Sequence, residues 1–121
     1  GKILCMRRPK KGSPSTAGKW EFPGGKTEVG EQPEDALRRE LREEMDYEVK
    51  VGKLITTVEY QYPDFSITLQ AFLCSADNTT FNRKEHIDHR WCLPHELPEL
   101  DWAAADEELI EMLVGGGYKW E

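Results

Sequence analysis

The sequence lacks a long hydrophobic run and carries few basic residues. None of its 121 residues belongs to a stretch near the ~20 apolar residues that a membrane-spanning helix needs, and its start lacks the charged and then apolar pattern of a secretory signal. Lysine and arginine number 16 against 23 aspartates and glutamates, a net charge of −7. This balance argues against duplex nucleic acid, because phosphate backbones bind basic surfaces. A phosphate ligand still fits if a divalent cation supplies the positive charge.

Cysteine is scarce as well, with three residues at Cys5, Cys74 and Cys92. Their number is odd, and they lie far apart among apolar neighbours. We interpret them as buried, reduced thiols of a cytoplasmic protein rather than as redox or metal-binding residues. The length, together with 38% hydrophobic and 32% charged residues, predicts a single domain over residues 1–121. No internal repeat or linker interrupts it.

Strand patterns alternate with loops and two helical stretches, which predicts an α/β (α+β) fold. β-branched and aromatic residues predict strands over residues 2–7, 48–62, 66–76 and 89–93. The two middle strands form a hairpin that turns at Pro63 and Asp64. Glycine, proline and serine predict loops over residues 8–20 and 21–32, and residues 115–121 form a loose tail.

The first predicted helix covers residues 33–45, with Pro33 at its first position, where the missing N–H costs nothing. A second helix follows a loop that begins near residue 94. Asp106 lies near its N-cap, and its inner face consists of Leu109, Ile110 and Leu113.

The first helix turns glutamates toward its apolar side. At about 100° per residue, Glu40 and Glu44 lie within the stripe that runs from Ala36 to Leu41, and Glu43 lies at its edge. Carboxylates on a buried face must be compensated. A divalent cation is one explanation, since oxygen ligands at this spacing suit magnesium. Pairing with Arg7, Arg8, Arg83 or Arg90 is another, and a wrong helix phase is a third.

The wider motif resembles a known family signature. From Gly25 the sequence reads five residues, Glu31, seven residues, Arg39-Glu40-Leu41, one residue and Glu43-Glu44. This pattern resembles the Nudix box, the loop–helix–loop signature of the Nudix hydrolases. The flanking segments GKWEFPGG, EYQYPDFSITL and KEHIDHRWCLPHEL are similar to the branch that contains MutT-type 8-oxo-dGTP diphosphatases and CTP pyrophosphohydrolases.

Two features depart from the family pattern. Asp46 stands just past the helix, where the family usually has glycine. Aspartate tolerates the left-handed conformation, so we expect only a small loss of stability there. Relatives also carry a strand before the segment that begins at Gly1, so an N-terminal strand is expected to be missing from this chain.

The resemblance implies an α/β/α sandwich around a mixed β-sheet, and hydrolysis of a nucleoside triphosphate to the monophosphate and pyrophosphate. Its cofactor is expected to be Mg²⁺, with Mn²⁺ as a substitute. The implied metal ligands are the Gly24 carbonyl, Glu40, Glu43 and Glu44. Gly24 and Gly25 let the backbone approach metal and phosphates closely. Glu31 is implied to pair with Arg39 and so to hold the catalytic helix in place.

A general base must be one of Glu43, Glu44 and Glu85, and the sequence does not choose among them. By resemblance, Glu85 reaches the metal or the attacking water, although an exposed loop glutamate is the simpler interpretation. The neighbouring His86 is a candidate to assist Glu85, but we interpret it as a solvated loop residue. A structural acidic domain that uses the glutamate helix as a partner surface is a remote alternative.

Recognition of the base is implied for Arg8, Phe22 and Asp106, with Trp20 and Glu21 nearby. Each has a plainer alternative: core packing for the aromatic residues, a surface charge for Arg8 and an N-cap for Asp106. Ionised aspartate offers only acceptors, which suits the amino group of cytosine. The sequence therefore favours a cytidine nucleotide, with 8-oxo-dGTP hydrolysis or non-catalytic nucleotide sensing as alternatives, and a monomer or homodimer that binds neither duplex nucleic acid nor membranes.

Overall fold

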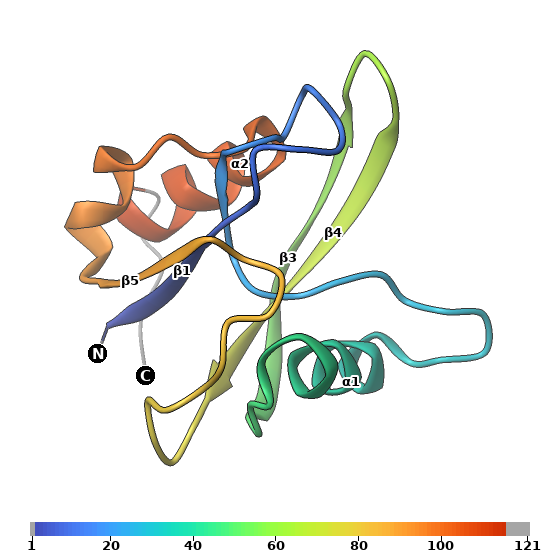
Figure 1. Cartoon of the computed structure of the whole chain (residues 1–121), viewed down its shortest axis with the longest axis vertical. Helices are drawn as coiled ribbons and strands as arrows, with labels where there is room; N and C mark the ends of the chain where they lie inside the picture. Colours follow the sequence, from blue (N-terminus) through green and yellow to red (C-terminus); the bar gives the residue numbers. More distant parts are fainter. Residues whose placement is uncertain (1, 116–121) are drawn as a thin grey trace.

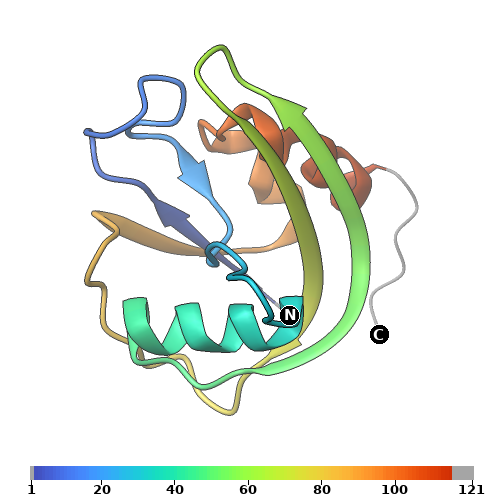
Figure 2. The same ribbon diagram turned by 90° about the vertical axis from the view of Figure 1, so that its right-hand side faces the viewer.

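Two antiparallel sheets lie between two helices (Figures 1 and 2). The computed structural model describes residues 2–115. One sheet has the order β2-β1-β5 and the other is a long hairpin of β3 and β4. The strands are β1 (Ile3–Arg7), β2 (Trp20–Glu21), β3 (Lys50–Gln61), β4 (Ser66–Ser75) and β5 (Asp88–Cys92). The helices are α1 (Pro33–Met45), the 3-10 helix η1 (Pro94–Glu99) and α2 (Ala104–Val114).

The predicted α/β class and the layered arrangement are confirmed, but the strands form two sheets rather than one mixed sheet. Every pairing between the named strands is antiparallel. Parallel pairing occurs at an isolated bridge between Trp20 and Trp102. Within the described residues, no helix is long and apolar enough to cross a membrane.

Strand β1 separates two hydrophobic clusters. Successive side chains of a strand point to opposite faces, so Leu4 and Met6 pack with α1 while Cys5 packs toward α2. The α1 side also contains Leu41, Met45 and Tyr47. The α2 side contains Cys92, Leu97, Trp102 and the predicted inner face of Leu109, Ile110 and Leu113. β1 thereby connects the two halves of the molecule, and the functional site is built at the end of this strand.

Helix α1 has the predicted bounds, with Pro33 in its first turn and a left-handed residue at its end. Asp46 has a φ of 51°, as expected for the position usually held by glycine. Its carboxylate also accepts hydrogen bonds from Asn82 Nδ2 and Lys84 Nζ, both at 2.9 Å. The aspartate therefore ties the end of α1 to the loop before β5, a contact that offsets the cost of its backbone conformation.

Three sequence predictions need correction. Residues 94–99 form η1 instead of a loop, because Pro94 begins a short turn in which Glu96 accepts a hydrogen bond from Leu93 N–H. Cys74 is exposed rather than buried, since it lies near the end of the hairpin; all three cysteines are free. Residues 20–21 pair with β1 although the sequence predicts loop there. The predicted tail from residue 115 lies, after Gly115, outside the described residues.

Candidate active site

The Gly24–Gly25 turn lies directly against the inner face of α1. A Cβ atom on Gly25 would stand 2.3 Å from Cδ of Glu40, so a glycine is required for the helix and the loop to approach this closely. Gly24 has a φ of 155°, which side-chain-bearing residues rarely adopt. Glu40 is 15% exposed. The turn therefore brings backbone groups beside a largely buried carboxylate.

Arg39 organises the acidic side chains of the loop and the helix. Its Nε and Nη2 donate to the two carboxylate oxygens of Glu31 at 2.7 and 3.1 Å. Its Nη1 donates to Glu40 at 2.8 Å and to Glu43 at 3.1 Å. A fork-to-fork arginine–carboxylate pair is strong and directional, and it holds the pKa of Glu31 below its usual range. The implied Glu31–Arg39 pair is thus present.

Glu44 lies among other carboxylates. Burial, a hydrogen bond with Glu40 and the negative charges of Glu40, Glu21 and Glu85 together raise its pKa to about 8. Each of these effects favours the proton-bound form of Glu44. A cation bound among these carboxylates would lower the pKa of Glu44 again, because it replaces repulsion between carboxylates with attraction to a shared positive charge.

A small cavity of about 270 Å³ opens beside Glu44. It is lined by Arg8, Pro9, Glu21, Gly24, Glu44, Glu85 and His86. The site therefore joins the end of β1, strand β2, the glycine turn, helix α1 and the loop before β5. Three glutamates from three different segments meet at its wall, which no local sequence pattern could show.

The side chains fit a hard divalent cation only after they rearrange. As they stand, no group of three His, Cys, Asp or Glu residues in the described part of the chain is placed to hold a metal ion. Glu40 and Glu43 are occupied by Arg39. Glu43 is 62% exposed and does not line the cavity. The oxygen-rich donor set nevertheless suits a hard divalent cation, with Gly24, Glu40 and Glu44 as the residues that would hold it.

Two residues of the loop before β5 border this cavity. Glu85 is exposed to solvent and also lines the cavity. The interpretation of His86 as a solvated residue is wrong. Its side chain is 4% exposed and its Nε2 lies 2.9 Å from Oε2 of Glu21. A polar local sequence conceals this burial, because the partner on β2 is distant in the chain.

Two of the implied base-binding residues, Phe22 and Asp106, lie outside the lining of the small cavity. Phe22 packs against Trp102 with a ring-centroid distance of 4.7 Å. Asp106 is 7% exposed and lies in the first turn of α2, where Ala103 rather than Asp106 is the N-cap. Burial and the charge of Glu21 raise the pKa of Asp106 to about 7, while the Phe22 N–H donates to its carboxylate and acts in the opposite direction. Trp20 and Phe22 are half-buried against the α2 cluster, so packing accounts for part of their placement.

Arg8 is partly exposed, and its Nη1 lies 3.5 Å from Oε1 of Glu21. It lines the cavity and is therefore more than a free surface charge. Tyr62, which the sequence did not single out, accepts a hydrogen bond from the Ala105 N–H at 2.9 Å through its hydroxyl. This contact holds the start of α2, and hence Asp106, against the hairpin. Its only sequence signal is a tyrosine at the hairpin turn.

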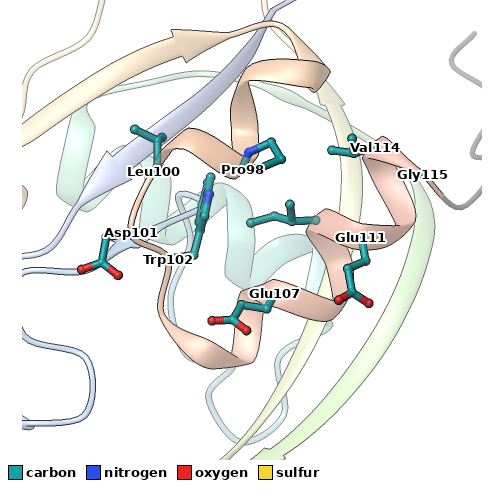
Figure 3. Close-up of a pocket in the computed structure, with 9 residues that line it drawn as sticks. Pro98, Leu100, Asp101, Trp102, Glu107, Glu111, Val114 and Gly115 are labelled. Carbon is teal, nitrogen blue, oxygen red and sulfur yellow. The ribbon is translucent and has the colours of Figure 1, made fainter.

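A larger cavity of about 720 Å³ lies between η1 and α2 (Figure 3). Trp102, Pro98, Leu100, Ile110 and Val114 supply its apolar wall, and Asp101, Glu107, Glu111 and Gly115 complete it. Its charged lining is acidic, and its lining contains no residue of the glycine turn or of α1. A polyphosphate would be repelled there. The smaller cavity is therefore the candidate active site, because glutamates from three segments, the glycine turn and Arg8 line it, although it is not the larger of the two.

Comparison with known proteins agrees with this geometry. The family model of the NUDIX domain matches residues 1–113. The chain is 38% identical over 114 residues to the CTP pyrophosphohydrolase of Escherichia coli K12, covering 94% of this chain and 83% of that protein. It is 39% identical over 94 residues to the 8-oxo-dGTP diphosphatase of Proteus vulgaris, covering 75% and 82%.

Among solved structures, the MutT protein of Methanosarcina mazei Go1 superposes with a TM-score of 0.85 at 23% identity, covering 98% of this chain and 87% of that one, which shows a shared fold. The matched family model spans nearly the whole chain, including the glycine turn, the α1 glutamates and Glu85. This chain is therefore a member of the Nudix hydrolase family.

Proposed function

We propose that this chain hydrolyses a nucleoside triphosphate to the nucleoside monophosphate and pyrophosphate, with Mg²⁺ as cofactor and a cytidine nucleotide as substrate. The observation that carries the proposal is the position of Glu44 among Glu40, Glu21 and Glu85, where its pKa is raised to about 8. Repulsion between carboxylates would only destabilise a helix that has a purely structural role. In a site that binds a cation together with a polyanion, the same carboxylates supply the negative charge that attracts the cation.

The positions of the glutamates relative to Arg39 and the cavity suggest which of them would bind the metal. Gly24, Glu40 and Glu44 would hold the metal, with Glu43 available at the helix edge once Arg39 releases it. Bound Mg²⁺ would offset the phosphate charge and stabilise the charge that develops during phosphoryl transfer. Arg39 and Glu31 keep α1 against the loop, so the helix backbone that carries the glutamates stays beside the glycine turn. Arg8 lines the cavity and would contact a phosphate oxygen.

We assign the removal of the proton from the attacking water to Glu85. It borders the same cavity as Glu44 but comes from a different segment, so it can remain free while the α1 carboxylates bind the metal. Glu43 is less suited because it lies outside the cavity lining. Glu44 is less suited because metal coordination would occupy it.

Selection of the base rests on Phe22 and Asp106. An aromatic ring gives a flat apolar surface on which a base can stack. Ionised Asp106 accepts a hydrogen bond from the amino group of cytosine, whereas neutral Asp106 also donates one. A pKa of about 7 populates both forms near neutral pH. This value supports 8-oxo-dGTP as a second candidate substrate. The E. coli and P. vulgaris relatives carry the names of these two activities.

A pyrophosphate-release assay tests the proposal. Purified protein is offered CTP, dCTP, 5-methyl-dCTP, 8-oxo-dGTP, dGTP and ATP with Mg²⁺, with Mn²⁺ and with EDTA. We expect metal-dependent release of pyrophosphate, fastest with a cytidine nucleotide, and its near loss in Glu44→Gln. Glu48→Gln is the matched control, since Glu48 is an exposed partner of Arg42 outside the cavity.

Two outcomes would contradict the proposal. Turnover that persists in EDTA would exclude the metal. Nucleotide binding without any product across the panel would instead support a nucleotide-sensing module. The proposal also implies a cytoplasmic protein that acts on free nucleotides as a monomer or homodimer.

A further inference from the structure

The carboxylate of Glu21 joins the ends of three strands. Its Oε1 lies 3.5 Å from Arg8 Nη1, and its Oε2 lies 2.9 Å from His86 Nε2. Arg8 follows β1, Glu21 ends β2 and His86 precedes β5. We call this group the Glu21 clamp. It crosses the order β2-β1-β5 at the edge where the small cavity opens, and all three side chains line that cavity.

His86 is the buried anchor of an otherwise exposed segment. Residues 82–85 and 87–89 are exposed on either side of it, whereas its side chain is 4% exposed. Because a carboxylate oxygen only accepts, the imidazole Nε2 donates to Glu21. The other ring nitrogen, Nδ1, is buried and has no hydrogen-bond partner within the described residues. Glu21 therefore sets the ring orientation through a single hydrogen bond.

This burial is energetically costly and calls for an explanation. A buried nitrogen without a partner loses its hydration and gains nothing in return. A histidine at an exposed loop position avoids that cost by turning into solvent. The segment is also connected to β1 by the backbone hydrogen bond from Ile87 N–H to Arg7 at 2.9 Å. That hydrogen bond fixes the backbone at Ile87, but it does not fix the direction in which the Glu85 side chain points.

Glu85 is the residue that precedes His86, and it lines the same cavity as Glu44. The His86 ring is held by Glu21, and the next residue, Ile87, is held by its backbone hydrogen bond to Arg7. Together these contacts leave the Glu85 backbone little freedom. We propose that His86 is a positioning residue that holds Glu85 at the reacting centre through Glu21. This inference rests on the proposed function, in which Glu85 accepts the proton of the attacking water.

The test compares His86→Ala with His86→Gln in steady-state kinetics with Mg²⁺ and the best nucleotide. The glutamine amide nitrogen can occupy the place of the imidazole Nε2 and donate to Glu21. We expect His86→Ala to lower kcat by about 10- to 100-fold, the range for residues that orient a functional group, with little change in KM. His86→Gln should recover most of the lost kcat.

His89→Ala is the matched control. His89 is exposed on β5, and its ring packs against Phe81 at 4.9 Å, away from the cavity lining. It reports the effect of removing a histidine that has only a packing role, so its kcat should stay near that of the unaltered protein. An unchanged kcat in His86→Ala would overturn the inference, as would equal losses in His86→Ala and His86→Gln.

Amide hydrogen exchange at residues 84–87 gives a readout that does not need turnover. We expect faster exchange in His86→Ala and near-normal exchange in His86→Gln, with melting temperatures recorded alongside. If the unaltered protein has no activity but this difference in exchange appears, the proposed function fails while the role of His86 in holding Glu85 stands. If exchange is the same in all variants, that role of His86 is overturned whatever the activity.

Discussion

The carboxyl group of Glu40 occupies the space that a side chain on Gly25 would need. A Cβ atom there would lie 2.3 Å from both Cδ and Oε2 of Glu40. Glu40 in turn accepts a hydrogen bond from Arg39 at 2.8 Å, which opposes its movement away from the loop. The glycine of the loop and the glutamate of the helix are therefore a matched pair.

Gly25→Ala should accordingly damage the site more than the fold. The added methyl group pushes the loop and Glu40 apart, and a displacement of about 1 Å costs about 100-fold in rate. We expect a loss of that order in kcat/KM for the nucleotide with Mg²⁺. Gly115→Ala is the control, because its Cβ would meet only Glu111 O at 3.7 Å. Equal activity of the two variants would show that the close approach is irrelevant to catalysis.

Glu44→Gln should abolish turnover and yet stabilise the metal-free protein at high pH. The ordinary pKa of a glutamate is 4.5, and in the fold that of Glu44 is raised to about 8. The folded state thus binds the proton more tightly, and the stability that this proton contributes is lost as the pH rises from 4.5 through 8. A glutamine keeps its hydrogens at every pH.

Thermal melts from pH 5 to 9 in EDTA measure this effect. The unaltered protein should lose stability across the range, and Glu44→Gln should lose less. Added Mg²⁺ should restore the melting temperature of the unaltered protein at pH 8 and above, where Glu44 is ionised, and have little effect on the variant. Parallel pH profiles for the two proteins would refute the assigned position of Glu44.

Arg39→Lys should weaken the metal site although the charge is kept. Lysine is a point charge that lacks the planar fork with which Arg39 contacts Glu31 at 2.7 and 3.1 Å. Loss of such supporting contacts lowers metal affinity or activity by about 10- to 100-fold. Mn²⁺ titration followed by electron paramagnetic resonance measures the affinity directly. Arg42→Lys, at an exposed arginine paired with Glu48, should bind Mn²⁺ normally.

Asp106 should make base selection depend on pH. Its pKa is raised to about 7, so the acceptor-only form gains population above that value and the donating form below it. Between pH 6 and 8 the ionised fraction rises roughly tenfold. The ratio of kcat/KM for CTP to that for 8-oxo-dGTP should therefore increase over this interval. Asp106→Asn, which has no titrating group, should remove the increase; a ratio that still rises in the variant would assign it to another residue.

Local patterns were sufficient to predict helix α1 and the inward direction of its glutamates. The spacing of the glutamates between Ala36 and Glu44 predicts the helix and its inward carboxylates, because residues three and four apart on a helix share a face whatever surrounds it. The Glu31–Arg39 pair was expected from the resemblance to the Nudix box, since Glu31 precedes the helix and lies eight residues from Arg39. The left-handed Asp46 was expected from the glycine that the family usually has at this position, and the backbone at a helix end depends on a few neighbouring residues.

The other residues of the candidate site come together through contacts between segments that are distant in the sequence. Glu21, His86 and Arg8 meet only because β2, β1 and β5 are neighbours, and the order of strands in a sheet is not encoded in any short segment. The same holds for Asp106. Its burial depends on Tyr62 holding the start of α2, and its raised pKa depends on that burial and on the charge of Glu21. Side-chain type is a property of the chain, whereas burial and electrostatic surroundings arise from segments that meet after folding.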